Sequence, residues 1–170
     1  MAVLIVSDSH RKKDELNLIV HRHQNEVTTF IHCGDSELKK DHPILAPFQI
    51  VGGNCDFFSK MPRDLIVTAD NMNILVTHGH HYDVKYNRGL LQTEARHMEC
   101  EVACYGHSHQ RKVEMIKGVL LINPGSIAQP RGPMEKTYAI LNKIDGKYLI
   151  DFYDLVGNVV EHVEFDLKKI

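Results

Sequence analysis

Short apolar runs separated by loops rich in Asp, His and Gly constrain the fold of this chain more than any other feature. Residues 2–7 are apolar and β-branched, which is typical of a strand buried in a parallel sheet. Residues 12–24 instead show the period of a helix, and residues 29–33 form a second apolar run. One face of that helix carries the apolar positions and one histidine: Leu16, Ile19, Val20 and His23. This order predicts a βαβ unit with two parallel strands.

The rest of the chain predicts further strands and one more helix. Strands are expected at 48–51, 65–69, 73–77, 102–105, 112–116, 119–123, 138–143, 147–153 and 159–167, and a helix at 87–99. Asp70-Asn71 and Asp145-Gly146 indicate tight hairpin turns, and the later strands are expected to be mostly antiparallel. The pattern predicts the α/β class: a layered α/β/β/α sandwich of two packed mixed sheets flanked by helices. The absence of a linker or internal repeat predicts a single domain over residues 1–170.

Composition excludes several classes of protein. The formal net charge is −2, from 20 basic and 22 acidic residues without a basic stripe, so no stable nucleic-acid surface is expected. No apolar run approaches the roughly 20 residues of a membrane-spanning helix, and the N-terminus lacks a signal-peptide pattern. The cysteines form no CxxC pair, which favours a reducing, cytoplasmic environment: Cys33, Cys55, Cys100 and Cys104.

Polar motifs follow several of the predicted strands at the point where each strand ends. They are Asp8-Ser9-His10, Gly34-Asp35, Gly53-Asn54-Cys55-Asp56, His78-Gly79-His80-His81 and Gly106-His107-Ser108-His109. In open α/β sheets, ligands bind beyond the carboxyl ends of the strands, so these side chains are expected to meet. Carboxylate and imidazole together suit divalent Zn, Fe, Mn, Co or Ni. Each motif alone is also explained as a solvated loop or a turn, but the ordered set favours a metal site.

These motifs resemble those of the calcineurin-like metallophosphoesterase superfamily. The chain length, the Gly53-Asn54-Cys55-Asp56 form and the later Asn123-Pro124-Gly125-Ser126 are similar to the small YfcE-type phosphodiesterases of bacteria and archaea. The resemblance implies the metallophosphoesterase fold and two divalent ions (Mn, Fe, Zn, Ni or Co), with Mn favoured for activity. By position, the first ion would be bound by Asp8, His10 and His109, the second by Asn54, His78 and His107, and Asp35 would bridge both. The implied mechanism is in-line attack on phosphorus by a metal-bridging hydroxide.

Two positions depart from the family pattern. Many members carry a His directly after the motif Asn, where it is proposed to protonate the leaving group, and this chain has Cys55. A thiol is a poor proton donor to an alkoxide, so diesters, or esters with acidic leaving groups, are favoured as substrates. Asn54, Cys55 and His80 are the candidate catalytic residues, with His81 an alternative proton donor, and Arg131 is a candidate substrate-phosphate ligand. The second departure, Leu38 in place of an Asp, is expected to be structural.

We therefore expect a metal-dependent phosphoesterase, with a phosphodiesterase favoured over a monoesterase and a small phosphate ester or diester as substrate. The alternative is a catalytically silent or metal-poor scaffold of the same fold, as in a retromer subunit of this superfamily. A third class, metal-dependent hydrolases of the metallo-β-lactamase type, lacks support because its His-x-His-x-Asp-His run is absent. Exposed edge strands in the C-terminal half allow a homodimer.

Overall fold

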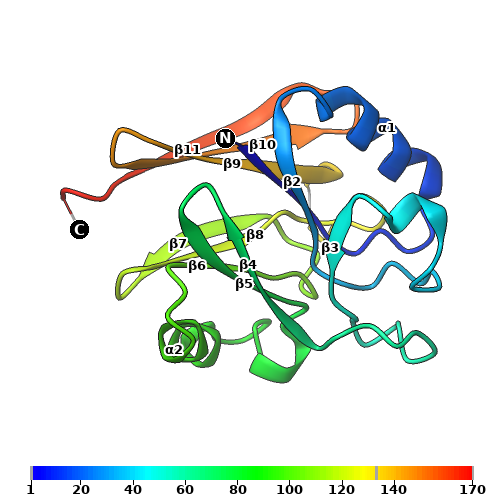
Figure 1. Cartoon of the computed structure of the whole chain (residues 1–170), viewed down its shortest axis with the longest axis horizontal. Helices are drawn as coiled ribbons and strands as arrows, with labels where there is room; N and C mark the ends of the chain where they lie inside the picture. The colour runs from blue at the N-terminus through cyan, green and yellow to red at the C-terminus, as the bar shows by residue number, and fades with distance from the viewer. Residues whose placement is uncertain (1, 133, 170) are drawn as a thin grey trace.

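The computed structural model describes residues 2–132 and 134–169. Two mixed sheets lie face to face, with one α-helix on the outer side of each (Figure 1). The six-stranded sheet has the order β11 (Val159–Asp166), β10 (Lys147–Asp154), β9 (Thr137–Ile144), β1 (Ala2–Val6), β2 (Val27–His32) and β3 (Phe48–Ile50). The five-stranded sheet has the order β4 (Asp64–Ala69), β5 (Met72–Thr77), β6 (Val102–Cys104), β8 (Val119–Asn123) and β7 (Lys112–Ile116). The helices are α1 (Lys13–His23) and α2 (Gly89–His97), with short 3-10 helices η1 (Pro43–Leu45) and η2 (His80–Tyr82).

The alternation of side chains along β1 explains why both of its faces are apolar. Val3 and Ile5 point into the core between the two sheets, where they join residues of β5 such as Ile74. Leu4 lies on the opposite face and packs in the cluster that includes Leu16 of α1. The second sheet is built in the same way, because α2 covers its outer face through a cluster of its own. The predicted α/β/β/α sandwich is therefore confirmed.

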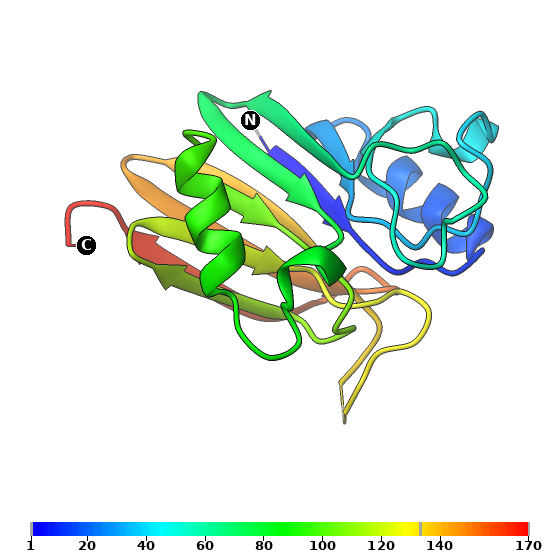
Figure 2. The same ribbon diagram turned by 90° about the horizontal axis from the view of Figure 1, so that it is seen from below.

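The strands that precede the polar motifs are parallel within each sheet. β1 pairs in parallel with β2, and β2 with β3, as the βαβ pattern predicts. In the other sheet β5 pairs in parallel with β6. The carboxyl ends of these strands, and the loops that follow them, gather at one end of the sandwich (Figure 2).

The boundaries of the elements differ from the prediction by a few residues. The hairpin between β4 and β5 turns at Asp70-Asn71 as expected, with both residues at positive φ. Helix α2 is shorter than the predicted span of 87–99 at both ends: Asn87 forms a turn with the Gly89 N–H before the helix, and Glu99 has a left-handed φ of 55° after it. Strand β2 begins at Val27, two residues before the predicted start, since Val27 pairs with Ala2 of β1.

Within the part of the chain that the structure describes, no helix is long and apolar enough to cross a membrane. All four cysteines are free thiols, and three of them, Cys33, Cys100 and Cys104, are buried.

Candidate metal centre

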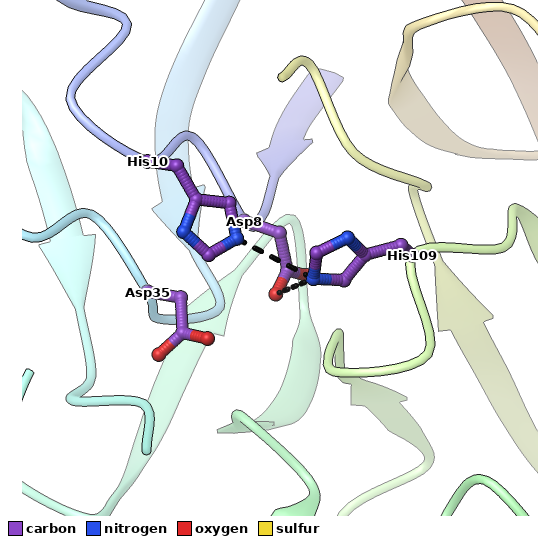
Figure 3. A group of neighbouring side chains, drawn as sticks. All are labelled: Asp8, His10, Asp35 and His109. Carbon is purple, nitrogen blue, oxygen red and sulfur yellow. Dashed lines mark hydrogen bonds and ion pairs between the residues drawn. The ribbon is translucent and has the colours of Figure 1, made fainter. Parts of the chain in front are cut away.

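Four of the predicted ligands form one compact cluster (Figure 3). Asp8, His10, Asp35 and His109 each place one donor atom within 4.8 Å of the others. They come from three loops, which follow β1, β2 and β6. The distance from His109 Nε2 to Asp8 Oδ1 is 3.1 Å, and from His109 Nε2 to His10 Nε2 it is 3.4 Å. The first predicted ligand set and the predicted bridging carboxylate therefore lie together.

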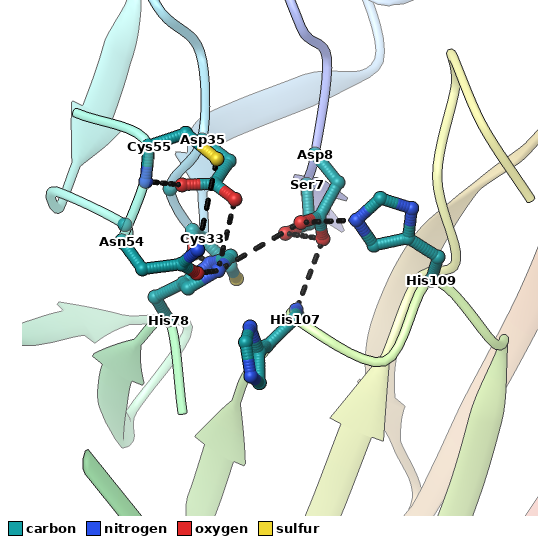
Figure 4. A network of polar contacts seen from close by, with 12 residues as sticks. Ser7, Asp8, Cys33, Asp35, Asn54, Cys55, His78, His107 and His109 are labelled. Carbon is teal, nitrogen blue, oxygen red and sulfur yellow. Dashed lines mark hydrogen bonds and ion pairs between the residues drawn. The ribbon is translucent and has the colours of Figure 1, made fainter. Parts of the chain in front are cut away.

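The second predicted ligand set adjoins the first through Asp35 (Figure 4). His78 Nε2 lies 3.0 Å from the Asn54 side-chain oxygen, 3.3 Å from Asp35 Oδ2 and 3.8 Å from Asp8 Oδ1. The His107 ring packs edge-on against the His78 ring, with centroids 5.1 Å apart. The seven predicted ligands are thus neighbours, and Asp35 contacts members of both sets: it shares the cluster with Asp8, His10 and His109 and lies 3.3 Å from His78.

Hydrogen bonds determine which nitrogen of each ring faces the cluster. Nδ1–H of His78 donates to the Cys33 carbonyl (2.8 Å), and Nδ1–H of His109 donates to the Gln129 carbonyl (2.7 Å). Nδ1–H of His10 donates to the Glu37 carboxylate at 3.2 Å. A neutral imidazole with its hydrogen on Nδ1 presents a lone pair at Nε2, the arrangement found for metal-binding histidines.

Lone pairs therefore face lone pairs in the middle of the cluster. Asp8 Oδ1 is buried and faces an Nε2 atom of neutral His109 that carries no hydrogen. Such contacts are repulsive unless positive charge lies among them, as a proton or as a cation. The pKa of His109 is raised, mainly by its contact with Asp8, and that of His78 is raised by Asp35 and Asp8 despite burial. Carboxylate oxygens with several Nε2 lone pairs fit a divalent transition-metal ion better than protons, because one cation satisfies several donors at once.

The carboxylates stay ionised in this environment. Burial raises the pKa of Asp35, but contacts with His78 and the Cys55 N–H outweigh it and hold that pKa well below its usual value. The pKa of Asp8 is likewise lowered, because His109, His78 and Ser7 outweigh the effect of burial. Both side chains are therefore available as anionic metal ligands at neutral pH.

Backbone strain is concentrated at the same residues. Several candidate ligands have left-handed φ values, which non-glycine residues seldom adopt: Asp8 (51°), His10 (39°), Asp35 (56°), His107 (67°) and His109 (58°). Each such residue costs on the order of 1 kcal/mol or more, and strain of this kind clusters at functional sites. Sharp turns directly after the strands aim these side chains inward.

Asp56 is a supporting residue whose role the sequence analysis missed. Its carboxylate accepts hydrogen bonds from the N–H groups of Asp35 (2.7 Å), Glu37 (2.7 Å) and Gly53 (2.8 Å). These bonds join the loop after β2 to the loop after β3. The turn expected at Gly53-Asn54-Cys55-Asp56 is present, since the Asp56 N–H donates to the Gly53 carbonyl. Its place at the end of this motif is the only sequence feature that indicates such a supporting role.

The Asn123-Pro124-Gly125-Ser126 loop lies beside the cluster, as the resemblance implied. The Ser126 hydroxyl donates to the Asp8 carbonyl at 2.8 Å. The Asn123 amide donates to the Gly106 carbonyl (3.0 Å) and to Ser108 Oγ (2.9 Å). The loop therefore supports the backbone of both the first and the last ligand motif.

His32 is a buried histidine to which the sequence analysis gave no role. The Gly34 N–H donates to its Nδ1 (3.1 Å), so its Nε2–H donates to Ser9 Oγ (2.8 Å). The neutral ring joins the loop after β1, through Ser9, to the loop after β2, through Gly34. A protonated ring has no acceptor nitrogen and would lose the bond from Gly34. Burial is the main cause that lowers its pKa from 6.5 to about 4.

This burial predicts an acid-dependent loss of stability. The pKa of His32 is about 4 in the folded chain and ordinary, 6.5, in the unfolded chain, so the unfolded state takes up the extra proton first as pH falls. Between pH 7 and pH 5, wild type should lose about 2 kcal/mol more free energy of unfolding than His32→Gln, which keeps a donor and an acceptor but does not titrate. Urea unfolding of both proteins in chelator measures the difference, and equal losses would contradict it.

The remaining predicted site residues lie around the cluster. The Cys55 N–H donates to Asp35 Oδ1 (2.8 Å), and burial together with Asp35 raises the pKa of its thiol to about 11. The His80 ring is half-buried, 5.3 Å from the His78 ring, and burial lowers its pKa to about 4. His81 is exposed, and its ring lies tilted against that of His80, with centroids 3.9 Å apart. Arg131 is exposed, and its N–H donates to the His109 carbonyl.

An α/β/β/α sandwich with Asp, His and Asn donors converging at the strand ends defines the metal-dependent phosphoesterase class. The model of the calcineurin-like phosphoesterase superfamily domain matches residues 1–146. The chain belongs to this phosphoesterase superfamily, which uses divalent metals.

Relatives and solved structures agree with this assignment. A probable metallophosphoesterase of Bacillus subtilis, YsnB, is 44% identical over 164 residues, which is 96% of this chain and 97% of the relative. A phosphodiesterase of Methanocaldococcus jannaschii is 28% identical over 144 residues, 74% of this chain and 83% of the relative. The crystal structure of a predicted phosphoesterase from Streptococcus pneumoniae superposes with a TM-score of 0.91 at 32% identity, covering 96% of each chain. Vps29 of Entamoeba histolytica complexed with Zn²⁺ shares the fold, with a TM-score of 0.74 at 20% identity over 98% of this chain and 99% of that one.

Proposed function

We propose that this protein is a binuclear-metal-dependent phosphodiesterase, in which hydroxide formed between two cations attacks phosphorus in line. The observation that carries the proposal is the convergence of Nε2 lone pairs and carboxylate oxygens around Asp35. Two divalent cations at such a centre supply a nucleophile at neutral pH and neutralise charge on the phosphoryl oxygens. Mn²⁺ is the cation that we favour for activity.

The protein's own residues position the reacting groups. Asp8, His10 and His109 would hold one cation, Asn54, His78 and His107 the other, and Asp35 would contact both. The strained turns and the Nδ1 hydrogen bonds fix these side chains before substrate arrives, so little reorganisation accompanies the reaction. Arg131, beside His109, would contact a substrate phosphate oxygen as substrate enters.

Cys55 supports a preference for diesters or for esters with acidic leaving groups. It occupies the position next to Asn54, and with a pKa of about 11 it stays protonated but is a weak acid. His80, with a pKa of about 4, is neutral at pH 7. It therefore lacks the acidic proton of an imidazolium ion that a general acid would donate. An alkoxide leaving group would therefore receive little help. The M. jannaschii relative named as a phosphodiesterase supports the same preference.

The proposal is tested by hydrolysis of bis-(p-nitrophenyl) phosphate and p-nitrophenyl phosphate after chelation and after reconstitution with Mn²⁺. We expect metal-dependent cleavage, with a higher kcat/KM for the diester. Metal-independent cleavage, or no cleavage of either ester by the metal-loaded protein, would contradict the proposal.

Cys55→His should raise kcat for p-nitrophenyl phosphate and, more strongly, for an alkyl monoester with a poor leaving group. General acid catalysis contributes roughly 10²- to 10⁴-fold, so an increase of about 10-fold or more is expected for the alkyl ester. Cys55→Ala is the matched control, since it removes the thiol without adding an acid. Equal rates for the His and Ala variants would show that proton donation does not limit the reaction.

A scaffold function is less well supported. The donor set is complete and oriented, whereas a scaffold does not require three Nε2 lone pairs aimed at buried carboxylates. The similarity to Vps29 concerns the fold. A homodimer through the exposed edge strand β11 is compatible with either function.

A further inference from the structure

A pocket is lined by residues on both sides of the loop that carries His107 and His109 in the chain, together with residues of the segment 84–88. Its volume is about 180 Å³, and Ser108, between the two candidate ligands, contributes to its wall. Four cationic side chains and a phenol also line it, namely Lys85, Arg88, Arg111, Lys112 and Tyr105, together with the amide of Gln110. No Asp or Glu lines this pocket within the described residues.

The two arginines are held in place from outside the pocket. Arg88 Nε donates to Glu114 at 2.7 Å, and the Arg88 side chain is 22% exposed. Arg111 donates through Nε to Glu161 (2.8 Å) and through Nη1 to Glu135 (2.7 Å), and its side chain is 15% exposed. Each guanidinium is anchored on one side and keeps a terminal nitrogen for a ligand, which is the preorganised geometry that suits phosphate.

The cations outnumber the acids that balance them. The three glutamates pair with Arg88, Arg111 and, at 3.7 Å, with Lys112. Lys85 lines the pocket and forms no ion pair with any residue that the structure describes. The positive charge of Lys85 is therefore available to a ligand in the pocket.

Two hydroxyl groups add uncharged donors. Tyr105 is 2% exposed, lines the pocket and carries a hydroxyl donor. Ser108 Oγ accepts hydrogen bonds from the Asn123 amide (2.9 Å) and the Gln110 N–H (3.3 Å), so its own hydrogen is left to donate. Both hydroxyl groups are donors from which a phosphate oxygen accepts hydrogen bonds.

We propose that this pocket binds a second, non-reacting phosphate group of the substrate. The inference rests on the proposed function: the substrate class becomes phosphodiesters that carry a terminal phosphate near the scissile bond. A tetrahedral polyanion matches a wall of guanidinium, ammonium and hydroxyl donors. Because Ser108 stands between His107 and His109 in the chain, this phosphate would lie against the loop that carries two of the candidate ligands.

The test uses two dinucleotides that differ only in a terminal phosphate, adenylyl-adenosine and its 5′-phosphorylated form, with the Mn²⁺-loaded protein. Wild type should cleave the phosphorylated form with a kcat/KM about 10- to 100-fold higher, the range expected for charge-assisted hydrogen bonds. Arg88→Met should reduce this ratio toward one, and Tyr105→Phe, which removes a single hydroxyl, should reduce it partly. Lys117→Met, in the exposed turn at the far end of β7 and β8, is the charge-matched control and should keep the wild-type ratio.

Binding of orthophosphate gives a second measurement that does not depend on turnover. The full-length chain is chelated, shown by circular dichroism to remain folded, and titrated with orthophosphate in a calorimeter. Binding that is weakened in Tyr105→Phe and kept in Lys117→Met supports the pocket, and no binding overturns it. Binding with a dinucleotide ratio of one in wild type would identify a site for free phosphate and overturn the substrate assignment. If no ester is cleaved, the proposed function fails. The orthophosphate titration then still shows whether the pocket binds a phosphate group.

Discussion

Asp35→Asn should lower kcat/KM for bis-(p-nitrophenyl) phosphate by roughly 10³-fold or more, which corresponds to about 4 kcal/mol of transition-state stabilisation. Asp35 is the carboxylate that both ligand sets share: it belongs to the cluster with His10, and its Oδ2 lies 3.3 Å from His78 Nε2. The substitution keeps the shape and removes the charge. The pKa of the Asp35 carboxyl is held low in the folded chain, so the wild-type side chain is an anion at the neutral pH of the assay.

The measurement is steady-state kinetics together with metal content for wild type and variant. Glu161→Gln is a suitable control, because it removes a carboxylate on β11 that pairs with Arg111 and is 45% exposed. It should bind metal as wild type does. An Asp35→Asn variant with full activity and full metal content would show that Asp35 does not bridge.

Gly53→Ala should displace the Asp35 carboxylate without changing Asp35 itself. A Cβ at Gly53 would lie 2.1 Å from Asp35 Oδ1 and 2.6 Å from the Asp35 backbone nitrogen, which is closer than any permitted contact. The Asp35 loop must therefore move, and a loss of about 10- to 100-fold in metal affinity is expected from the displaced ligand and its supports. The rate should fall with it.

Gly52→Ala is the matched control for this prediction. Its neighbour is also a glycine, but a Cβ at Gly52 would meet Met61 Cβ at 3.4 Å, an ordinary contact. The two variants share their composition and differ only in whether the added methyl group meets Asp35. Metal titration by calorimetry on both decides the matter, and similar metal affinities in the two variants would contradict the predicted contact.

The positions of the candidate ligands were predictable from the sequence because they depend on local order. Strands β1, β2, β5 and β6 are short apolar runs, and Asp8, Asp35, His78 and His107 stand just beyond their ends. Parallel pairing then brings these ends to one edge of the sandwich. The layered fold was predictable for a related reason, since the switch between period 2 and period 3.6 marks each strand and helix.

The supporting contacts were not predictable, because they arise from tertiary structure. The carbonyls of Cys33 and Gln129 orient two histidines, and every residue has a carbonyl, so no side-chain pattern marks them. The burial of His32 depends on how two loops close over β2. Strand order within the sheets, such as β8 between β6 and β7, is likewise set by long-range packing. The donor-lined pocket beside Ser108 combines loops from distant parts of the chain.

The central claim is that the cluster around Asp35 holds two cations at once. Crystals of the Mn²⁺-loaded protein, measured at the manganese absorption edge, test it most directly through an anomalous difference map. We predict two peaks roughly 3.5–4 Å apart, with Asp35 between them. A single peak at full occupancy, or peaks located away from Asp8, Asp35 and His78, would contradict the account.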